Sequence, residues 1–246
     1  NNLRKRELIN ILFNEHILKE VSSILNKNSI RFLVFKGLAL SYLTTNSSVK
    51  RGESIDIDIL IQENDLQKTI NLLKNNGFLM DKKYLIFENN NFASKFSKFS
   101  KNELTLIKKS KNLICKIDLH WKISIIDSLM PKFEDIYASR KNLIFYDQVI
   151  PTLNEENAFK LSCIHCAIDN WKCIRDFIDI ERLSRKVSRS RLNELSKNRI
   201  IRMGEDKNYV FNVGCPSIDA LKSVKKSSHV LKKYNLTLPY FLLIQH

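Results

Sequence analysis

Hydrophobic residues in the first part of the chain switch between helical and strand spacing. Residues 3–28 place Leu, Ile and Val at intervals of three and four, which predicts an opening amphipathic helix. "RFLVFKG" (31–37) predicts a short strand that ends at a glycine, and "LALSYL" (38–43) predicts the helix after it. "SIDIDILI" (54–61) predicts the next strand, because apolar and polar residues alternate along it.

A further helix follows this strand. "LQKTINLLKNN" (66–76) has helical spacing, and Asn64 or Asp65 stands before it as an N-cap. Gly77 follows in the C′ position, where a left-handed backbone commonly ends a helix. The pattern up to this point is that of an α/β unit.

The remaining pattern divides the chain into two parts. "ELTLIKK" (103–109) and "LICKIDLHW" (113–121) predict two strands joined by a hairpin turn. After Pro151 the spacing becomes helical, and residues 154–186 predict two consecutive helices. We therefore expect an α/β (α+β) fold: a small mixed sheet flanked by helices in residues 1–147, and a mostly helical part in residues 148–246.

Two aspartates interrupt the strand 54–61. Side chains alternate along a strand, so Asp56 and Asp58 point to the same side while isoleucines pack behind them. Two carboxylates on one face repel each other unless a cation lies between them, and hard oxygen ligands suit Mg²⁺. The alternative is an ordinary edge strand whose aspartates face water.

Residues in neighbouring segments favour the metal interpretation. Asp118, in "KIDLH", would add a third carboxylate if its strand lay beside the first. Lys36 and Gly37 stand where a strand turns into a helix, and the helix N-terminus and the lysine charge suit a phosphate. Glycine is scarce, with 5 in 246 residues, so its use at this turn is informative.

These motifs occur in an order that resembles the DNA polymerase beta-like nucleotidyltransferase superfamily. The chain is most similar to the bacterial group of uncharacterised nucleotidyltransferases, over about residues 30–185. The resemblance rests on "FLVFKGLALSYL", an arginine before "DIDILI", "GF" after a helix, "IDLHW", and "LSCIHCAIDNWKCIRDFIDIERL". The wider superfamily has Gly-Ser or Gly-Gly at the turn, whereas this chain has Lys36, Gly37 and Leu38, so the serine hydroxyl is missing.

The resemblance implies roles for individual residues. It makes Asp56, Asp58 and Asp118 the catalytic carboxylates and the ligands of two Mg²⁺ ions. It places Lys36, Gly37 and Arg51 at the triphosphate of an ATP-like NTP donor. It makes residues 1–147 the nucleotidyltransferase catalytic domain with an N-terminal helix.

The reaction implied is in-line transfer of an NMP group from the NTP to an acceptor hydroxyl, with release of pyrophosphate. The acceptor classes left open are a small molecule, a tRNA end and a protein side chain. The alternative is a non-catalytic, basic nucleic-acid-binding protein that retains the fold. The donor base, the acceptor, the oligomeric state and the pathway are not readable from the residues.

Two histidines are candidates for the acceptor side. By alternation His120 shares the face of Asp118, although a structural histidine at the strand end explains it equally well. His165 lies in the family-like helical stretch and either lines the acceptor side or holds the helices together. In "CIHC" (163–166), helical spacing favours core cysteines over a zinc site, since no second CxxC follows.

Charge and composition add expectations about partners and location. The net charge of +15 is compatible with a nucleic-acid partner, and residues 182–202 are strongly basic but carry no aromatic residues for base stacking. The chain lacks the roughly 20-residue apolar run that crosses a bilayer. Five cysteines and a polar start favour a cytoplasmic protein with reduced thiols and no membrane partner.

Overall fold

The structure is a computed structural model, and it describes residues 2–52, 54, 56–87, 102–123, 129–145, 147–169 and 173–195. Contacts divide the chain into two compact units, residues 1–154 and 155–246. No helix among these described ranges is long and apolar enough to cross a membrane.

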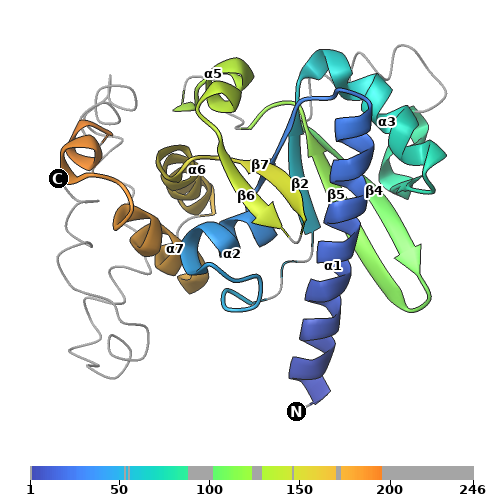
Figure 1. The fold of residues 1–246 in the computed structure, drawn as a ribbon, viewed down its shortest axis with the longest axis horizontal. Helices are drawn as coiled ribbons and strands as arrows, with labels where there is room; N and C mark the ends of the chain where they lie inside the picture. The colour runs from blue at the N-terminus through green and yellow to red at the C-terminus, as the bar shows by residue number, and fades with distance from the viewer. Residues whose placement is uncertain are drawn as a thin grey trace. The chain divides into compact units, whose positions relative to one another are not determined.

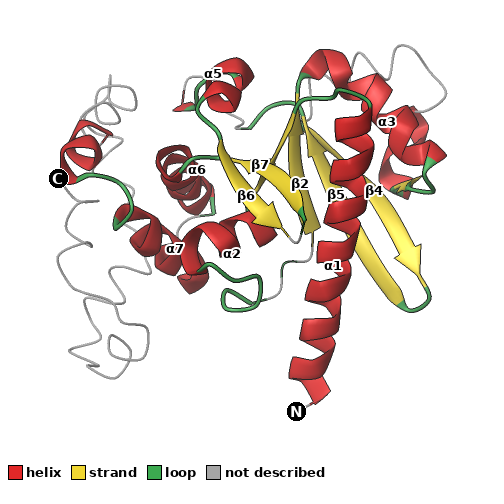
Figure 2. Ribbon diagram, in the orientation of Figure 1, coloured by secondary structure: helices red, strands yellow, loops and turns green. Residues whose placement is uncertain are grey.

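The first unit contains a sheet and the helices packed around it (Figure 1, Figure 2). Its helices are α1 (Asn2–Lys27), α2 (Gly37–Thr45), α3 (Leu66–Asn75) and α5 (Phe133–Ala138), with 3-10 turns η1 (Glu63–Asp65) and η2 (Lys82–Phe87). Its strands are β1 (Phe32–Phe35), β2 (Asp56–Ile61), β3 (Leu79–Met80), β4 (Glu103–Ser110), β5 (Leu113–His120), β6 (Lys141–Phe145) and β7 (Gln148–Thr152).

The sheet is mixed. Within the described part of the chain it has seven strands in the order β3-β4-β5-β2-β1-β7-β6. β2 is parallel to β5 and β1 is parallel to β7, whereas the other neighbours are antiparallel. This arrangement confirms the predicted mixed sheet flanked by helices.

One face of the sheet forms the main core with α1 and α3. Ile57, Ile59 and Ile61 of β2 are fully buried there, as the alternation predicts. Apolar residues of both helices join them in one cluster, including Ile11, Ile17, Leu18, Val21, Leu25, Leu66, Ile70 and Leu73. Because the odd-numbered residues of β2 face this core, its even-numbered aspartates face the opposite side.

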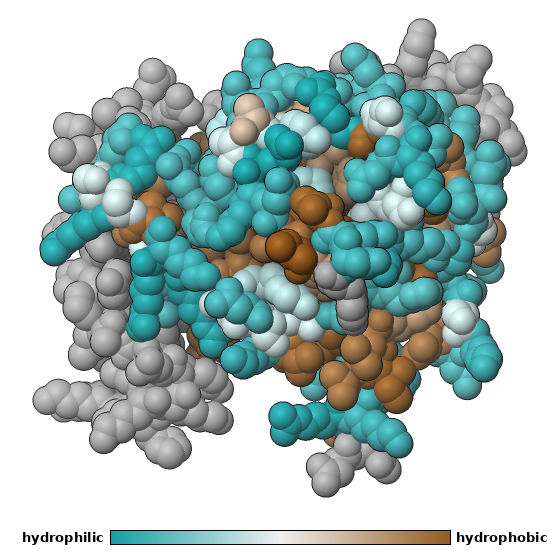
Figure 3. All heavy atoms as spheres, in the orientation of Figure 1, coloured by the Kyte–Doolittle hydropathy of each residue, from teal (hydrophilic) through white to brown (hydrophobic). Residues whose placement is uncertain are grey.

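The N-terminal half of α1 extends beyond the strands (Figure 1). Leu3, Leu8, Ile9 and Leu12 are exposed there, and Figure 3 shows hydrophobic surface along this part of the helix. Further along, the side-chain amide of Asn14 donates a hydrogen bond to the carbonyl of Ser54, 2.9 Å away. The middle of α1 therefore holds the segment that leads into β2.

Every strand and helix predicted up to residue 121 is present, but β6 and β7 were missed. β7 contains Pro151, which lacks a backbone N–H and makes a strand assignment unfavourable from sequence. Its residues Ile150 and Thr152 are nevertheless buried, and Val34 of β1 is the parallel partner of Thr152. The sheet unit therefore continues past the boundary expected at residue 147, and helices begin after Asn154.

The second unit is helical in its described part. It contains α6 (Glu155–Ile168), α7 (Ile174–Ser184) and a short helix over residues 189–195. Cys163 and Cys166 pack against Phe177 and Ile180 of α7, so the cysteines of "CIHC" are core residues, as expected. Of the basic segment 182–202, residues 196–202 lie outside the described residues.

Candidate active site

The pairing of β2 with β5 brings together three carboxylates from distant parts of the chain. Asp58 and Asp118 are direct register partners across the two parallel strands. Asp56 lies two residues before Asp58, so it projects from the same face. The register therefore meets the condition stated from the sequence, that the strand of Asp118 lie beside the strand of the Asp-x-Asp motif.

Asp58 is the most enclosed of the three, with 5% of its surface exposed. Its Oδ1 atom lies 3.2 Å from Nζ of Lys36 and 3.1 Å from Nε2 of His120. The other ring nitrogen of His120, Nδ1, lies 3.4 Å from Oε2 of Glu103. The His120 ring also packs edge-on against Phe35, with ring centroids 4.9 Å apart.

The other two carboxylates are half-buried, and each is also held at Oδ1. The hydroxyl of Thr105 on β4 donates to Asp118 at 2.7 Å. The hydroxyl of Ser54 lies 3.3 Å from Oδ1 of Asp56 and 3.1 Å from its backbone carbonyl. These contacts fix the orientation of each carboxylate and do not involve Oδ2.

The electrostatics differ among the three groups. Burial raises the pKa of Asp56, and the charge of Asp58 raises it further. Burial likewise raises the pKa of Asp118, and the hydrogen bond from Thr105 only partly opposes it. For Asp58 burial acts in the same direction, but the hydrogen bond from His120 and the charge of Lys36 outweigh it and lower the pKa.

The same carboxylates also change the pKa of Lys36. Burial alone would lower its pKa, but the charge of Asp58 and the hydrogen bond to it raise the pKa. Lys36 thus remains an ammonium beside the acidic cluster. Its positive charge offsets only part of the charge of three carboxylates, which leaves a strongly anionic site for a cation.

The turn at Gly37 lies directly against the start of β2. Lys36 and Gly37 both have positive φ, at 58° and 36°, and α2 begins at Gly37. A Cβ atom at Gly37 would lie 2.8 Å from Oγ of Ser54 and 3.2 Å from the carbonyl of Asp56. Because of this close approach, the N-terminus of α2 and the Asp-x-Asp strand lie side by side, as a shared phosphate and cation site requires.

The two remaining predicted residues lie elsewhere. Arg51 is half-buried in the turn that precedes β2. His165 lies on α6 in the second unit, where its Nδ1 atom is 3.1 Å from Oδ2 of Asp169. Asp176 of α7 also approaches this pair, and one ligand atom of each of the three residues lies within 4.8 Å of the others. The roles of Arg51 and His165 stay predictions.

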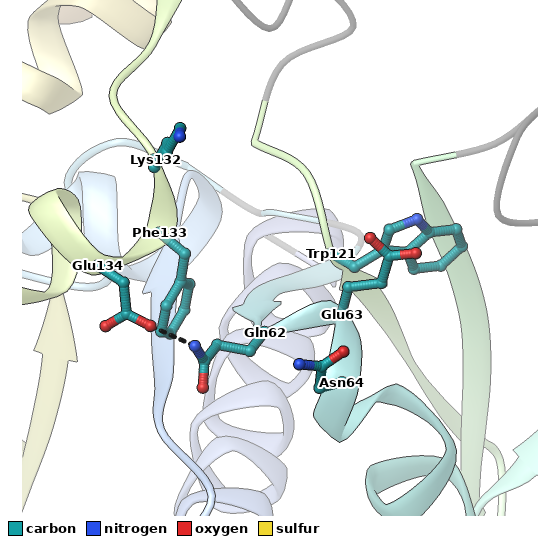
Figure 4. Close-up of a pocket in the computed structure, with 7 residues that line it drawn as sticks. All are labelled: Gln62, Glu63, Asn64, Trp121, Lys132, Phe133 and Glu134. Carbon is teal, nitrogen blue, oxygen red and sulfur yellow. Dashed lines mark hydrogen bonds between the residues drawn. The ribbon is translucent and has the colours of Figure 1, made fainter.

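A pocket of about 320 Å³ opens at the carboxyl ends of β2 and β5 (Figure 4). Its lining residues are Gln62, Glu63, Asn64, Trp121, Lys132, Phe133 and Glu134. Arg31 joins two of them, since its guanidinium donates to Glu134 at 2.7 Å and to Gln62 at 2.9 Å. Gln62, directly after β2, lies four residues beyond Asp58, and Trp121, directly after β5, lies three residues beyond Asp118. At about 3.3 Å per residue, the backbone of these lining residues is about 10–13 Å along the strands from that of the aspartates.

Three neighbours were not predicted from the sequence: Thr105 and Ser54, which contact aspartates, and Glu103, which contacts His120. A signal for Thr105 exists in the hairpin: a turn at residues 111–112 pairs Ser110 with Leu113, and the same register pairs Thr105 with Asp118. The same count pairs Glu103 with His120.

The donor set fits a hard divalent cation. Three carboxylates on one face supply oxygen ligands, which Mg²⁺ prefers, and residues from neighbouring strands orient them. Among the residues that the structure describes, the imidazole of His120 engages Asp58, and the thiol of Cys115 belongs to the buried core cluster. Neither favours a softer metal over a hard one at the three carboxylates.

Comparison with known proteins points in the same direction. A family model described as "Uncharacterised nucleotidyltransferase" matches residues 1–209. The comparison with curated proteins finds no match.

Two solved structures of ANT(2″)-Ia share the fold. The solution structure of the antibiotic-resistance factor ANT(2″)-Ia has a TM-score of 0.53 at 8% identity, covering 80% of this chain and 97% of that chain. The crystal structure of ANT(2″)-Ia in complex with adenylyl-2″-tobramycin has a TM-score of 0.51 at 8% identity, covering 77% and 98%. The lincomycin-bound lincosamide antibiotic adenylyltransferase LnuA gives 0.44 at 16% identity, covering 68% and 94%.

Proposed function

Since the chain belongs to the family of uncharacterised nucleotidyltransferases and resembles the DNA polymerase beta-like superfamily in its motifs, we propose that it transfers an NMP group from an NTP to an acceptor hydroxyl. The observation that supports this most strongly is the register of Asp58 with Asp118, with Asp56 on the same face. Three carboxylates so placed suit a site for divalent cations and a triphosphate.

The donor side of the reaction is assigned to the turn at Gly37. The first backbone N–H groups of α2 are available to phosphate oxygens, and the helix dipole favours negative charge there. Lys36 adds an ammonium that lies 3.2 Å from Asp58, and we propose that it also contacts a phosphate bound at the turn. Arg51, in the turn before β2, is proposed as a further phosphate contact.

The chemistry is a displacement at the α-phosphorus. The acceptor oxygen forms a bond to this phosphorus, the bond to the bridging oxygen breaks, and pyrophosphate leaves. Asp118, whose pKa burial raises, is proposed to receive or orient the acceptor proton. Mg²⁺ held by Asp56, Asp58 and Asp118 would supply charge neutralisation and lower the pKa of the acceptor hydroxyl.

A labelling experiment tests the proposal and searches for the acceptor. The purified protein is incubated with each α-³²P-labelled NTP and Mg²⁺, together with separated small-molecule, RNA and protein fractions of a cell extract. Transfer should label one fraction and release unlabelled pyrophosphate. The Asp58→Asn variant, prepared in parallel, should leave that fraction unlabelled.

The outcome also separates the two classes of function. Label in one fraction, lost in the variant, supports the transferase and names its acceptor class. If no fraction is labelled with any NTP, and the protein binds RNA equally well with and without Mg²⁺, the protein is a non-catalytic nucleic-acid binder and the proposal is wrong.

A further inference from the structure

His120 is buried beside Asp58 in the acidic cluster. Its side chain is 6% exposed, whereas the side chain of Lys36, the other basic residue that contacts Asp58, is 30% exposed. Both nitrogens of the ring face carboxylates, Nε2 toward Asp58 and Nδ1 toward Glu103, and Phe35 packs against the ring edge-on. Contacts with Asp58, Glu103 and Phe35 therefore fix the orientation of the ring.

We propose that His120 is a positioning residue that fixes the carboxylate of Asp58 for the cation. This inference rests on the proposed function and deepens it. Nε2 lies 3.1 Å from Oδ1 of Asp58, and a carboxylate oxygen can only accept, so Nε2 carries the proton of this hydrogen bond. With Oδ1 held by the protein, Oδ2 remains as the oxygen that binds the cation.

The geometry separates the roles of His120 and Lys36, although both contact the same oxygen. Lys36 has a long and partly exposed side chain, so it can leave Asp58 when a triphosphate arrives. His120 cannot leave, because its strand position, Phe35 and Glu103 hold it. The histidine therefore determines the direction of the carboxylate both with and without nucleotide.

Register explains why this residue occupies this position. His120 pairs with Leu60 of β2, two residues beyond the pair Asp58 and Asp118, so its side chain leaves the same face as both aspartates. From there the ring reaches diagonally back to Asp58, which a shorter side chain at this position could not do. To contact an acceptor, His120 would need a ring nitrogen that does not already face a carboxylate. Both of its nitrogens face carboxylates, which favours the positioning role over an acceptor contact.

Two amide substitutions separate the hydrogen bond from the packing of the ring. In His120→Gln the side-chain amide nitrogen stands near the position of Nε2 and keeps a donor for Asp58. In His120→Asn the amide stands near the position of Nδ1, so it faces Glu103 and leaves Asp58 without this donor. Both variants lose the ring and its contact with Phe35, so each controls for the packing of the other.

The experiment measures Mn²⁺ binding to the full chain by titration calorimetry and electron paramagnetic resonance, without nucleotide or acceptor. His120→Asn should weaken Mn²⁺ binding by about 10- to 100-fold, the usual loss when a group that orients a metal ligand is removed. His120→Gln should bind Mn²⁺ close to the wild-type affinity. Thermal unfolding should show similar losses of stability for the two variants.

Three results would overturn the positioning role: wild-type Mn²⁺ affinity in His120→Asn, equal weakening in both variants, or no Mn²⁺ binding by the wild type. Parallel labelling assays keep this inference distinct from the proposed function. Transfer activity together with unchanged Mn²⁺ affinity in His120→Asn removes only the role of His120. Differential Mn²⁺ binding without any transfer removes only the transferase proposal.

Discussion

Asp58 and Asp118 face each other across two adjacent parallel strands, β2 and β5. The connection between these strands runs through α3 and the β4–β5 hairpin, as parallel pairing requires a crossover. Register partners in a parallel pair project from the same face, so the two carboxylates share one site with Asp56.

Replacing any one aspartate of the cluster by asparagine should reduce transfer by at least about 100-fold, because each supplies charge to the same preorganised site. Asp56→Asn, Asp58→Asn and Asp118→Asn are compared in the labelling assay, with circular dichroism to verify folding. Asp135→Asn, an exposed aspartate on α5, is the control and should retain activity. Full activity in a folded variant of the cluster would exclude that residue from the site.

Thr105→Val should lower kcat by about 10-fold while the protein stays folded. The substitution keeps the shape of the side chain but removes the hydroxyl that donates to Asp118 at 2.7 Å, so this carboxylate loses its fixed orientation. Thr105→Ser keeps the donor and should stay near the wild-type rate. Steady-state kinetics of the two variants provide the measurement, and equal rates for Val and Ser would contradict the role of this hydroxyl.

Gly37→Ala should lower both stability and transfer. Its φ of 36° disfavours a side chain, and the added Cβ would lie 3.2 Å from the carbonyl of Asp56, so the turn would press on the acidic strand. Gly77→Ala is the matched control, since φ is 79° but the nearest atom is the flexible end of Lys108 at 3.5 Å. The control should lose about 1 kcal/mol of unfolding free energy and keep its activity.

The two glycine variants together distinguish a general loss of stability from a local effect of the turn on Asp56. If thermal unfolding and transfer fall together in both, the effect of Gly37→Ala comes from instability alone. A transfer defect confined to Gly37→Ala, measured well below its unfolding temperature, assigns the defect to the turn beside Asp56.

Arg191→Gln should destabilise the protein at pH 7 but not near pH 2. The guanidinium of Arg191 donates to both carboxylate oxygens of Glu156, at 2.8 and 2.9 Å, and with Lys160 it lowers the pKa of Glu156 from 4.5 to about 2. A depressed pKa contributes stability that is full above pH 4.5 and is lost as the pH falls through about 2. Both side chains are partly exposed, so the loss at pH 7 should be about 1 kcal/mol.

Thermal unfolding of Arg191→Gln and the wild type between pH 7 and pH 2 measures this difference. Arg189→Gln, which replaces an exposed arginine of the same helix, should match the wild type throughout. A destabilisation of Arg191→Gln that is constant across this pH range would show that the carboxylate of Glu156 does not carry the effect.

The sequence by itself determined the local elements and the identity of the acidic residues. Spacing of apolar residues follows directly from helix and strand geometry, so α1, α3, β2 and the hairpin of β4 and β5 were predictable. Alternation in β2 also determined that Asp56 and Asp58 share a face opposite the buried isoleucines. The glycine between a strand and a helix marked the turn at residue 37.

Only the tertiary structure decided which strands distant in the sequence became neighbours. The pairing of Asp58 with Asp118, the enclosure of His120 between Asp58 and Glu103, and the inclusion of β7 despite Pro151 all depend on contacts between distant segments. Such contacts are selected by burial of the whole sheet face, which no local window of residues contains. The chemistry of the site was therefore readable residue by residue, whereas its geometry required the fold.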